Sequence, residues 1–208
     1  MNRIMQLTGV GLLLVAVPLA AQKTASRTVN GSSIAVSVKS NGAISQFAVA
    51  AMPVGGGQAS DDAANVAMPQ LTSASTAAVT AGEADADGLG SQQSVATASN
   101  VNLLNGLITA DRVVGIASVT MNGKTIAGDV DGSVITNLVV NGTPVSSGDA
   151  MPAANTRMNI PGGYVVLNEQ TMSGGHGNQG MSVSVRMIHV YLTTGDEIVV
   201  GSASSSIQ

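Results

Sequence analysis

The sequence contains no cysteine and no tryptophan, and its aromatic residues are limited to Phe47, Tyr164 and Tyr191. The absence of cysteine excludes disulfides, thiolate metal sites and a cysteine nucleophile. With so few rings, the core must consist of aliphatic side chains and methionine, each of which buries less area than an aromatic ring. We therefore expect a thin core, of the kind that lies between two sheets.

Charge is also scarce, because only 10% of the residues are charged and the formal net charge is −4. The eight basic residues are scattered along the chain rather than clustered. Contacts to phosphate require grouped Lys and Arg side chains. We therefore expect no nucleic-acid partner.

An apolar stretch over residues 7–21 is too short for a comfortable membrane span of about 20 residues. Arg3 precedes it, and small residues end it at Ala20 and Ala21. This pattern predicts a secretory signal helix over residues 1–21, cleaved after Ala21. The alternative is an uncleaved N-terminal anchor. Cleavage predicts a protein secreted to the bacterial cell surface, with no remaining membrane segment.

The most frequent local signal is the Asn-Gly dipeptide, which favours the type I′ turns of β-hairpins because both residues tolerate φ > 0. Several of the pairs lie between runs rich in Val, Ile, Ser and Thr, so the chain is predicted to be all-β. The five pairs are Asn30-Gly31, Asn41-Gly42, Asn105-Gly106, Asn122-Gly123 and Asn141-Gly142.

The composition and the hydrophobic pattern of the sequence divide the chain into four parts. Residues 1–21 form the leader, and residues 22–51 form an N-terminal hairpin that is a candidate donor strand. Residues 52–93, rich in Ala, Gly, Ser and Asp, are predicted to form a long loop insertion. Residues 94–208 supply the rest of an antiparallel β-sandwich or jelly-roll-like domain. Within that part, strands are expected at 94–104, 107–121, 124–127, 132–140, 156–160, 163–170, 181–193 and 197–204.

One predicted strand changes its alternation. Val183, Val185 and Met187 are apolar at odd positions, whereas Ile188 and Val190 are apolar at even positions. Such a change indicates either a bulge or a strand that is buried on both faces.

Seven ordered blocks between residues 94 and 203 resemble the choice-of-anchor P family of bacterial exported surface proteins. The resemblance implies export, surface attachment and no well-established enzymatic activity. The sequence ends in SSSIQ, without the sorting motif that a C-terminal wall anchor would need. The blocks are LNGLITAD at 104–111, LVVNGTPV at 138–145, NTR at 155–157, IPG at 160–162, YVVLNEQ at 164–170, IHV at 188–190 and VVGSA at 199–203.

Catalytic patterns are sparse. The histidines are His176, in a glycine-rich segment, and His189, in a predicted strand, and no G-x-S-x-G elbow occurs. Asp111 and Glu169 are the candidates for a glycosidase carboxylate pair. The simpler interpretation pairs Asp111 with Arg112 or a turn, and Glu169 with Arg157 or Arg186. We predict that the protein is not an enzyme and needs no cofactor.

Glu83, Asp85 and Asp87, followed by Gly88, resemble the first half of a calcium-binding loop. Ser94 occupies the place of the expected distal carboxylate. Asp129 and Asp131 could add oxygen ligands if folding brought them close. These residues are the candidate calcium site, and the alternative is a solvated acidic loop.

Two functions follow. The first is a secreted structural subunit that forms a filament or surface layer, in which each copy completes its neighbour's sheet with an N-terminal strand, so that its partners are copies of itself. The alternative is a monomeric adhesin or ligand-binding module, calcium-dependent if the acidic loop binds the ion, whose partners are cell-surface or host glycans.

Overall fold

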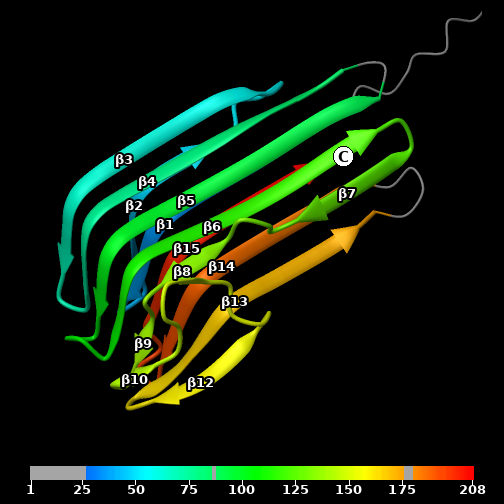
Figure 1. Ribbon diagram of the computed structural model, residues 1–208. Coiled ribbons are helices and arrows are strands. Elements are labelled where there is room, and N and C mark those ends of the chain that lie inside the picture. The colour runs from blue at the N-terminus through cyan, green and yellow to red at the C-terminus, as the bar shows by residue number, and fades with distance from the viewer. Residues whose placement is uncertain (1–26, 86–87, 176–179) are drawn as a thin grey trace, which may run out of the picture.

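The computed structural model describes residues 27–85, 88–175 and 180–208, and these form two antiparallel sheets packed face to face (Figure 1). The predicted β-sandwich is confirmed. In the described ranges, no helix has the length and apolar character needed to cross a membrane. The predicted leader over residues 1–21 lies outside the described residues.

Sheet A has six strands, in the order β12-β13-β14-β15-β1-β2. The chain enters this sheet as a hairpin and returns to it at the end, so that β15 lies beside β1. The bounds are β1 (Val29–Ser40), β2 (Ala43–Ala51), β12 (Thr156–Ile160), β13 (Gly163–Gly174), β14 (Met181–Leu192) and β15 (Glu197–Ile207).

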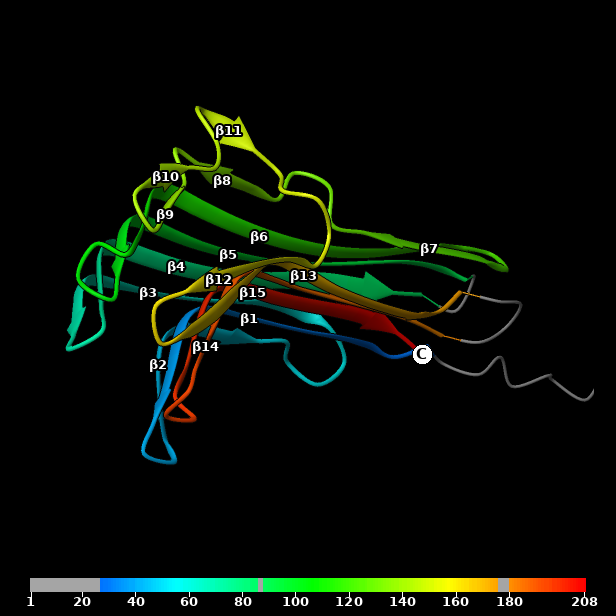
Figure 2. The same cartoon turned by 90° about the horizontal axis from the view of Figure 1, so that it is seen from below.

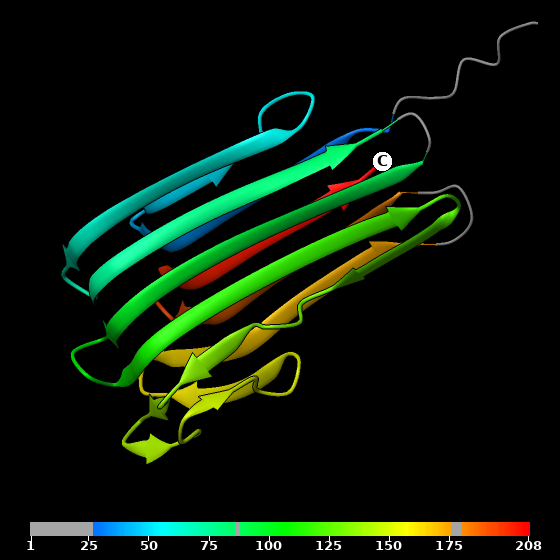
Figure 3. The ribbon, with the colours of Figure 1, turned by 45° about the horizontal axis from the view of Figure 1, so that its top comes forward.

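Sheet B contains the order β10-β9-β6-β5-β4-β3, with β7 and β8 also paired to β6, and β11 paired to β8. Figure 2 shows the two sheets as stacked layers, and Figure 3 shows the long strands of sheet B running side by side. The bounds are β3 (Gly57–Met68), β4 (Leu71–Ala84), β5 (Leu89–Leu103), β6 (Ile108–Asn122), β7 (Thr125–Asp129), β8 (Val134–Thr136), β9 (Val139–Val140), β10 (Thr143–Pro144) and β11 (Asp149–Ala150).

The prediction of a long loop over residues 52–93 is wrong, because β3, β4 and the start of β5 occupy most of it. The inward side chains of β4 include Ser73, Thr76, Ala78 and Thr80, all of them buried. Small residues give a weak strand signal in sequence, yet they are the ones that fit between closely spaced sheets.

Three of the five Asn-Gly pairs have φ > 0 at both residues, as hairpin turns require: Asn41-Gly42, Asn105-Gly106 and Asn141-Gly142. Asn30-Gly31 is not a turn but lies inside β1. A Cβ on Gly31 would lie 1.7 Å from Nε2 of Gln92, so the glycine makes room for a buried amide from the other sheet.

The two sheets approach each other through backbone at Gly115 of β6 and Gly201 of β15. A Cβ placed on Gly115 would lie 2.3 Å from the carbonyl oxygen of Gly201. Gly115 continues an inward row whose other members are Ala96 and Ala78. Buried Ala35, Ala48 and Ala50 cluster with Ala78 across the interface. This part of the interface is therefore packed by residues with little or no side chain, beside a larger core of Val, Ile, Leu and Met side chains that includes Leu167, Met187 and Ile188.

Serine side chains join the sheets at this short separation. Ser33 of β1 donates to the carbonyl of Val79 at 3.0 Å, and Ser94 of β5 donates to that of Ser204 at 2.8 Å. Ser205 of β15 donates to the carbonyl of Ala117 at 2.6 Å. Sheets that pack through large side chains lie about 10 Å apart, too far for a serine to reach the opposite backbone. The hydrogen bonds therefore require the close approach.

A line of left-handed residues crosses each sheet. In sheet A, the register places Asn168, Gly201 and Ala48 in one transverse row on alternate strands, with φ of 49°, 71° and 51°. In sheet B, Asn65, Asn100 and Asn137 form the matching row, with φ of 53°, 51° and 52°. We call each row a crease. Asn tolerates this conformation best among non-glycine residues.

At the creases, the side-chain alternation shifts by one residue. In sheet A two consecutive residues face inward, as at Met187 and Ile188, whereas in sheet B two consecutive residues face outward, as at Asp111 and Arg112. The changed alternation predicted at residues 187–188 is therefore part of a shift shared by neighbouring strands.

Gly115→Ala is expected to destabilise the fold by about 1–3 kcal/mol, because the new methyl group would overlap the Gly201 carbonyl and force the sheets apart. Urea unfolding of wild type and variant measures the change. Ala77→Val, at an exposed outward position of β4, is the matched control and should have little effect. Equal stability of Gly115→Ala and wild type would contradict the close approach.

Candidate functional site

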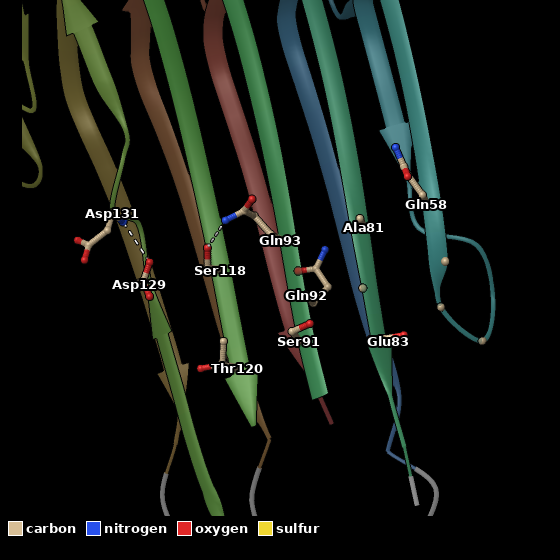
Figure 4. A pocket seen from close by; sticks show the side chains of 14 residues that line it. Gln58, Ala81, Glu83, Ser91, Gln92, Gln93, Ser118, Thr120, Asp129 and Asp131 are labelled. Carbon is tan, nitrogen blue, oxygen red and sulfur yellow. Dashed lines mark hydrogen bonds between the residues drawn. The ribbon is translucent and has the colours of Figure 1, made fainter. Parts of the chain in front are cut away.

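A hollow with a volume of about 1130 Å³ lies on the outer face of sheet B (Figure 4). One row of side chains crosses five strands at its floor, because the register aligns Gln58, Ala81, Gln93, Ser118 and Asp129. A second row contains Glu83, Ser91 and Thr120. We call this region the polar hollow.

The shape of the hollow results from short side chains on the outer face of sheet B and from the loop before β3. Gly55, Gly56 and Gly57 all have positive φ and border the hollow at the β3 side. Ala81 at its centre leaves the floor low between Gln58 and Gln93. Larger residues at these positions would fill the space.

The lining can both donate and accept hydrogen bonds. Gln93 donates from Nε2 to Oγ of Ser118 at 3.1 Å, and Oδ1 of Asp129 accepts from the backbone N–H of Asp131 at 3.1 Å. The described lining residues include the carboxylates Glu83, Asp129 and Asp131 but neither Lys nor Arg. The site is therefore polar and acidic, which suits a ligand with many hydroxyl groups and disfavours an anion.

The predicted calcium ligands are divided in space. Glu83 is exposed at the end of β4, Oδ1 of Asp85 accepts from the backbone N–H of Leu89 at 2.9 Å, and Asp87 lies outside the described residues. Asp129 is on β7, three strands from Glu83 and thus roughly 14 Å away across the sheet. No set of three metal-binding side chains is found among the described residues. Folding does not bring Asp129 and Asp131 to Glu83, and the calcium site stays a prediction.

Asp111 and Glu169 do not form a carboxylate pair, because they lie on different sheets. Asp111 accepts a hydrogen bond from Nδ2 of Asn137 at 2.6 Å. The predicted pairing of Asp111 with Arg112 is wrong, because Arg112 instead pairs with Asp149 at 3.2 Å. The predicted pairing of Glu169 with Arg186 is confirmed at 3.0 Å. His176 lies outside the described residues.

A second polar group, which we call the tyrosine cluster, lies on the outer face of sheet A. Its rings come from β13 and β14, and a guanidinium from β12 covers one end of the stack. The guanidinium of Arg157 lies 3.8 Å from the ring centre of Tyr164, Tyr164 stacks on Tyr191 at 4.8 Å, and Tyr191 contacts His189 at 3.9 Å. Because each ring is covered by the next group, the stack stabilises the association of neighbouring strands and does not form an open surface on which a ligand could stack.

Glu169 connects the cluster. Its carboxylate accepts from Nδ1 of His189 at 2.7 Å, from Arg186 at 3.0 Å and from the hydroxyl of Tyr191 at 3.2 Å. His189 lies in β14, as the sequence predicted, and is only 4% exposed. Its Nε2 faces Oε2 of Glu197 at 3.5 Å, an electrostatic contact rather than a hydrogen bond.

The cluster shifts the titration of its members. Burial would raise the pKa of Glu169, but hydrogen bonds and charge from His189 and Arg186 outweigh it and lower that pKa. The hydrogen bond from Lys39 likewise lowers the pKa of Glu197. Burial, followed by the charge of Glu169, raises the pKa of Tyr191 to about 12.

Sequence reasoning missed Tyr164, Tyr191 and Glu197 as cluster members, and Gln58, Gln93 and Ser118 as lining of the hollow. Each group is assembled by register between strands that are distant in sequence. For example, Tyr164 lies opposite Tyr191, and Tyr191 lies opposite Glu197. Without the strand order, no local pattern joins these residues.

Glu169→Gln is expected to lower the melting temperature at neutral pH and to flatten its decline in acid. A lowered folded-state pKa stabilises the fold above the ordinary glutamate pKa, and this stabilisation is lost as the pH falls through the folded-state value. Melting curves from about pH 7 to about pH 3 measure the difference. Glu83→Gln, exposed on sheet B, is the control. A Glu169→Gln curve parallel to that of wild type throughout would disprove the role of the network.

A family model described as a domain of unknown function, DUF8256, matches residues 28–153. The matched region starts just before β1 and runs beyond β11, so it covers the first hairpin of sheet A and every strand of sheet B. No curated protein and no solved structure matches the chain. Because the model covers more than half of the sequence, the chain belongs to the DUF8256 family.

Proposed function

We propose that the protein is an exported bacterial surface protein that binds its ligand as a monomer, through the polar hollow of sheet B. The observation that carries the proposal is the aligned row of Gln58, Gln93, Ser118 and Asp129 on the floor of a hollow of about 1130 Å³. Convergent polar groups in a concave surface fix the orientation of a bound ligand and give specificity.

Support for export comes from the sequence. The apolar stretch after Arg3, the small residues at Ala20 and Ala21, and the resemblance to exported surface proteins over residues 94–203 all favour it. Export, surface location and the absence of enzymatic activity stay predictions of this proposal.

The N-terminal strand is already used within its own sheet. β1 pairs with β15 on one side and with β2 on the other, from Val29 onward. This pairing weighs against a spare donor strand over residues 29–40. This placement favours a self-contained binding module over a subunit that donates this strand to its neighbour.

The exposed edge of sheet B also carries features that hinder strand addition. β3 is the last strand of its sheet, and Asp61 and Asp62 place two carboxylates in its middle. Asn65 interrupts its regular alternation with φ of 53°. Oδ2 of Asp61 also accepts from the backbone N–H of Val49 at 2.9 Å, which caps part of the edge of β2. Charges and irregularities at edges are common devices against aggregation.

Self-assembly into a filament or surface layer is the second candidate, and one observation favours it. β12 pairs with β13 only as far as Leu167, so within the described residues the stretch from Thr171 to Gly174 has no partner strand on that side. Met172 in this stretch is 46% exposed. A strand from another copy would pair with this edge.

Ala81→Arg is expected to abolish ligand binding, because the long side chain would fill the floor of the hollow without disturbing the buried face. The measurement is retention of the purified protein on immobilised surface polymers: peptidoglycan, neutral polysaccharides, alginate and chitosan. Ser184→Arg places the same side chain on the outer face of sheet A and should bind as wild type does. Equal retention of both variants, or no retention of wild type on any polymer, would overturn the proposal.

The purified protein is expected to sediment as a monomer across a wide concentration series and to form no filaments in electron micrographs. Replacing both edge carboxylates, by Asp61→Val with Asp62→Val, should promote association because it exposes an uncharged strand edge. Asp129→Asn, which removes a charge from β7 on the opposite side of sheet B from β3, is the control. Regular filaments of wild type would establish the assembling subunit instead.

A further inference from the structure

We infer that the ligand of the polar hollow is a neutral, hydroxyl-rich polysaccharide that lies across the strands of sheet B. This inference rests on the proposed function and specifies its ligand. It is carried by three properties of the hollow: the chemistry of its lining, its charge and its length.

The lining matches a polyol. Each hydroxyl of a sugar both donates and accepts, and the row offers amides at Gln58 and Gln93, a hydroxyl at Ser118 and a carboxylate acceptor at Asp129. An apolar ligand would remove these groups from water without replacing their hydrogen bonds, at a cost of about 1–3 kcal/mol for each group left unsatisfied. Ligands without hydroxyl or amide groups are therefore disfavoured.

The charge of the hollow selects among polymers. Glu83 is on β4, toward the β3 side of the hollow, and Asp129 is on β7 at the other side, with Asp131 beside it. An anionic chain would meet these charges without a basic residue from the described lining to offset them. Uncharged sugars instead gain charge-assisted hydrogen bonds to the same carboxylates.

The length of the hollow indicates a chain rather than a single sugar. The row from Gln58 to Asp129 crosses five strands, so it extends for roughly 19 Å at about 4.8 Å per strand spacing. Repeated donors and acceptors at this spacing contact several consecutive sugar units. Because the row of polar side chains runs across the strands, the bound polysaccharide chain runs in the same direction.

Binding of the polysaccharide to a single polar hollow is expected to be weak. Both tyrosines of the chain lie in the tyrosine cluster on sheet A, so the sugars bind without ring stacking. Hydrogen bonds to exposed groups exchange for bonds to water and give modest net affinity. A dissociation constant on the order of 0.1–1 mM follows, and many copies on one surface would strengthen attachment through avidity.

Affinity electrophoresis in gels containing soluble polysaccharides tests the ligand class. The probes are dextran, glucomannan and xyloglucan as neutral chains, alginate as an anionic chain and chitosan as a cationic chain. We expect at least one neutral chain to retard wild type and Ser184→Arg, but not Ala81→Arg. Gln93→Ala, which alters an exposed side chain, should weaken the binding roughly tenfold through loss of its amide contacts.

The outcomes separate this inference from the proposed function. Retardation only by alginate or only by chitosan, lost in Ala81→Arg, overturns the neutral ligand but keeps the hollow as a binding site. Neutral-chain retardation that survives both Ala81→Arg and Gln93→Ala overturns the placement of the ligand in the hollow. If no polymer distinguishes Ala81→Arg from Ser184→Arg, both the inference and the proposed function fail.

Discussion

The contact between Gly115 and Gly201 sets the distance between the two sheets, and most other features of the fold depend on that distance. It permits the serine hydrogen bonds from Ser33, Ser94 and Ser205 to the opposite backbone. It also explains the composition, because a narrow interface accommodates Ala, Gly and Ser but leaves little room for rings. A chain with three aromatic residues thus packs one part of its interface through the closeness of the sheets, and fills the rest of the core with Val, Ile, Leu and Met side chains.

The creases and the polar hollow also use small and polar residues. Left-handed residues recur in one row across each sheet: Gly201 and Ala48 in sheet A, Asn65 and Asn100 in sheet B. Short side chains on the outer face of sheet B leave its surface low, which creates the polar hollow above Ala81. The proposed binding function therefore uses a surface whose shape comes from the small residues of the whole sandwich.

Sequence patterns predicted the long strands from residue 94 onward to within a few residues, because Val and Ile alternate there and Asn-Gly turns separate the runs. They joined β8 and β9 into one strand and missed the short strands β10 and β11. They failed over residues 52–93, where the inward positions hold Ala, Ser and Thr instead of large apolar residues. The changed alternation at Met187 was visible in sequence, but its extent across neighbouring strands was not, since that extent depends on register. For the same reason, neither the polar hollow nor the tyrosine cluster was predictable as a group.

Nuclear Overhauser spectroscopy of isotopically labelled protein tests the close approach of the sheets most directly. The account predicts cross-peaks between the α-protons of Gly115 and Gly201, together with slow hydroxyl exchange at Ser94 and Ser205, whose hydrogen bonds join the sheets. Absence of the glycine cross-peaks, with rapid exchange of both hydroxyl protons, would show that the sheets are held apart by larger side chains and would contradict the account.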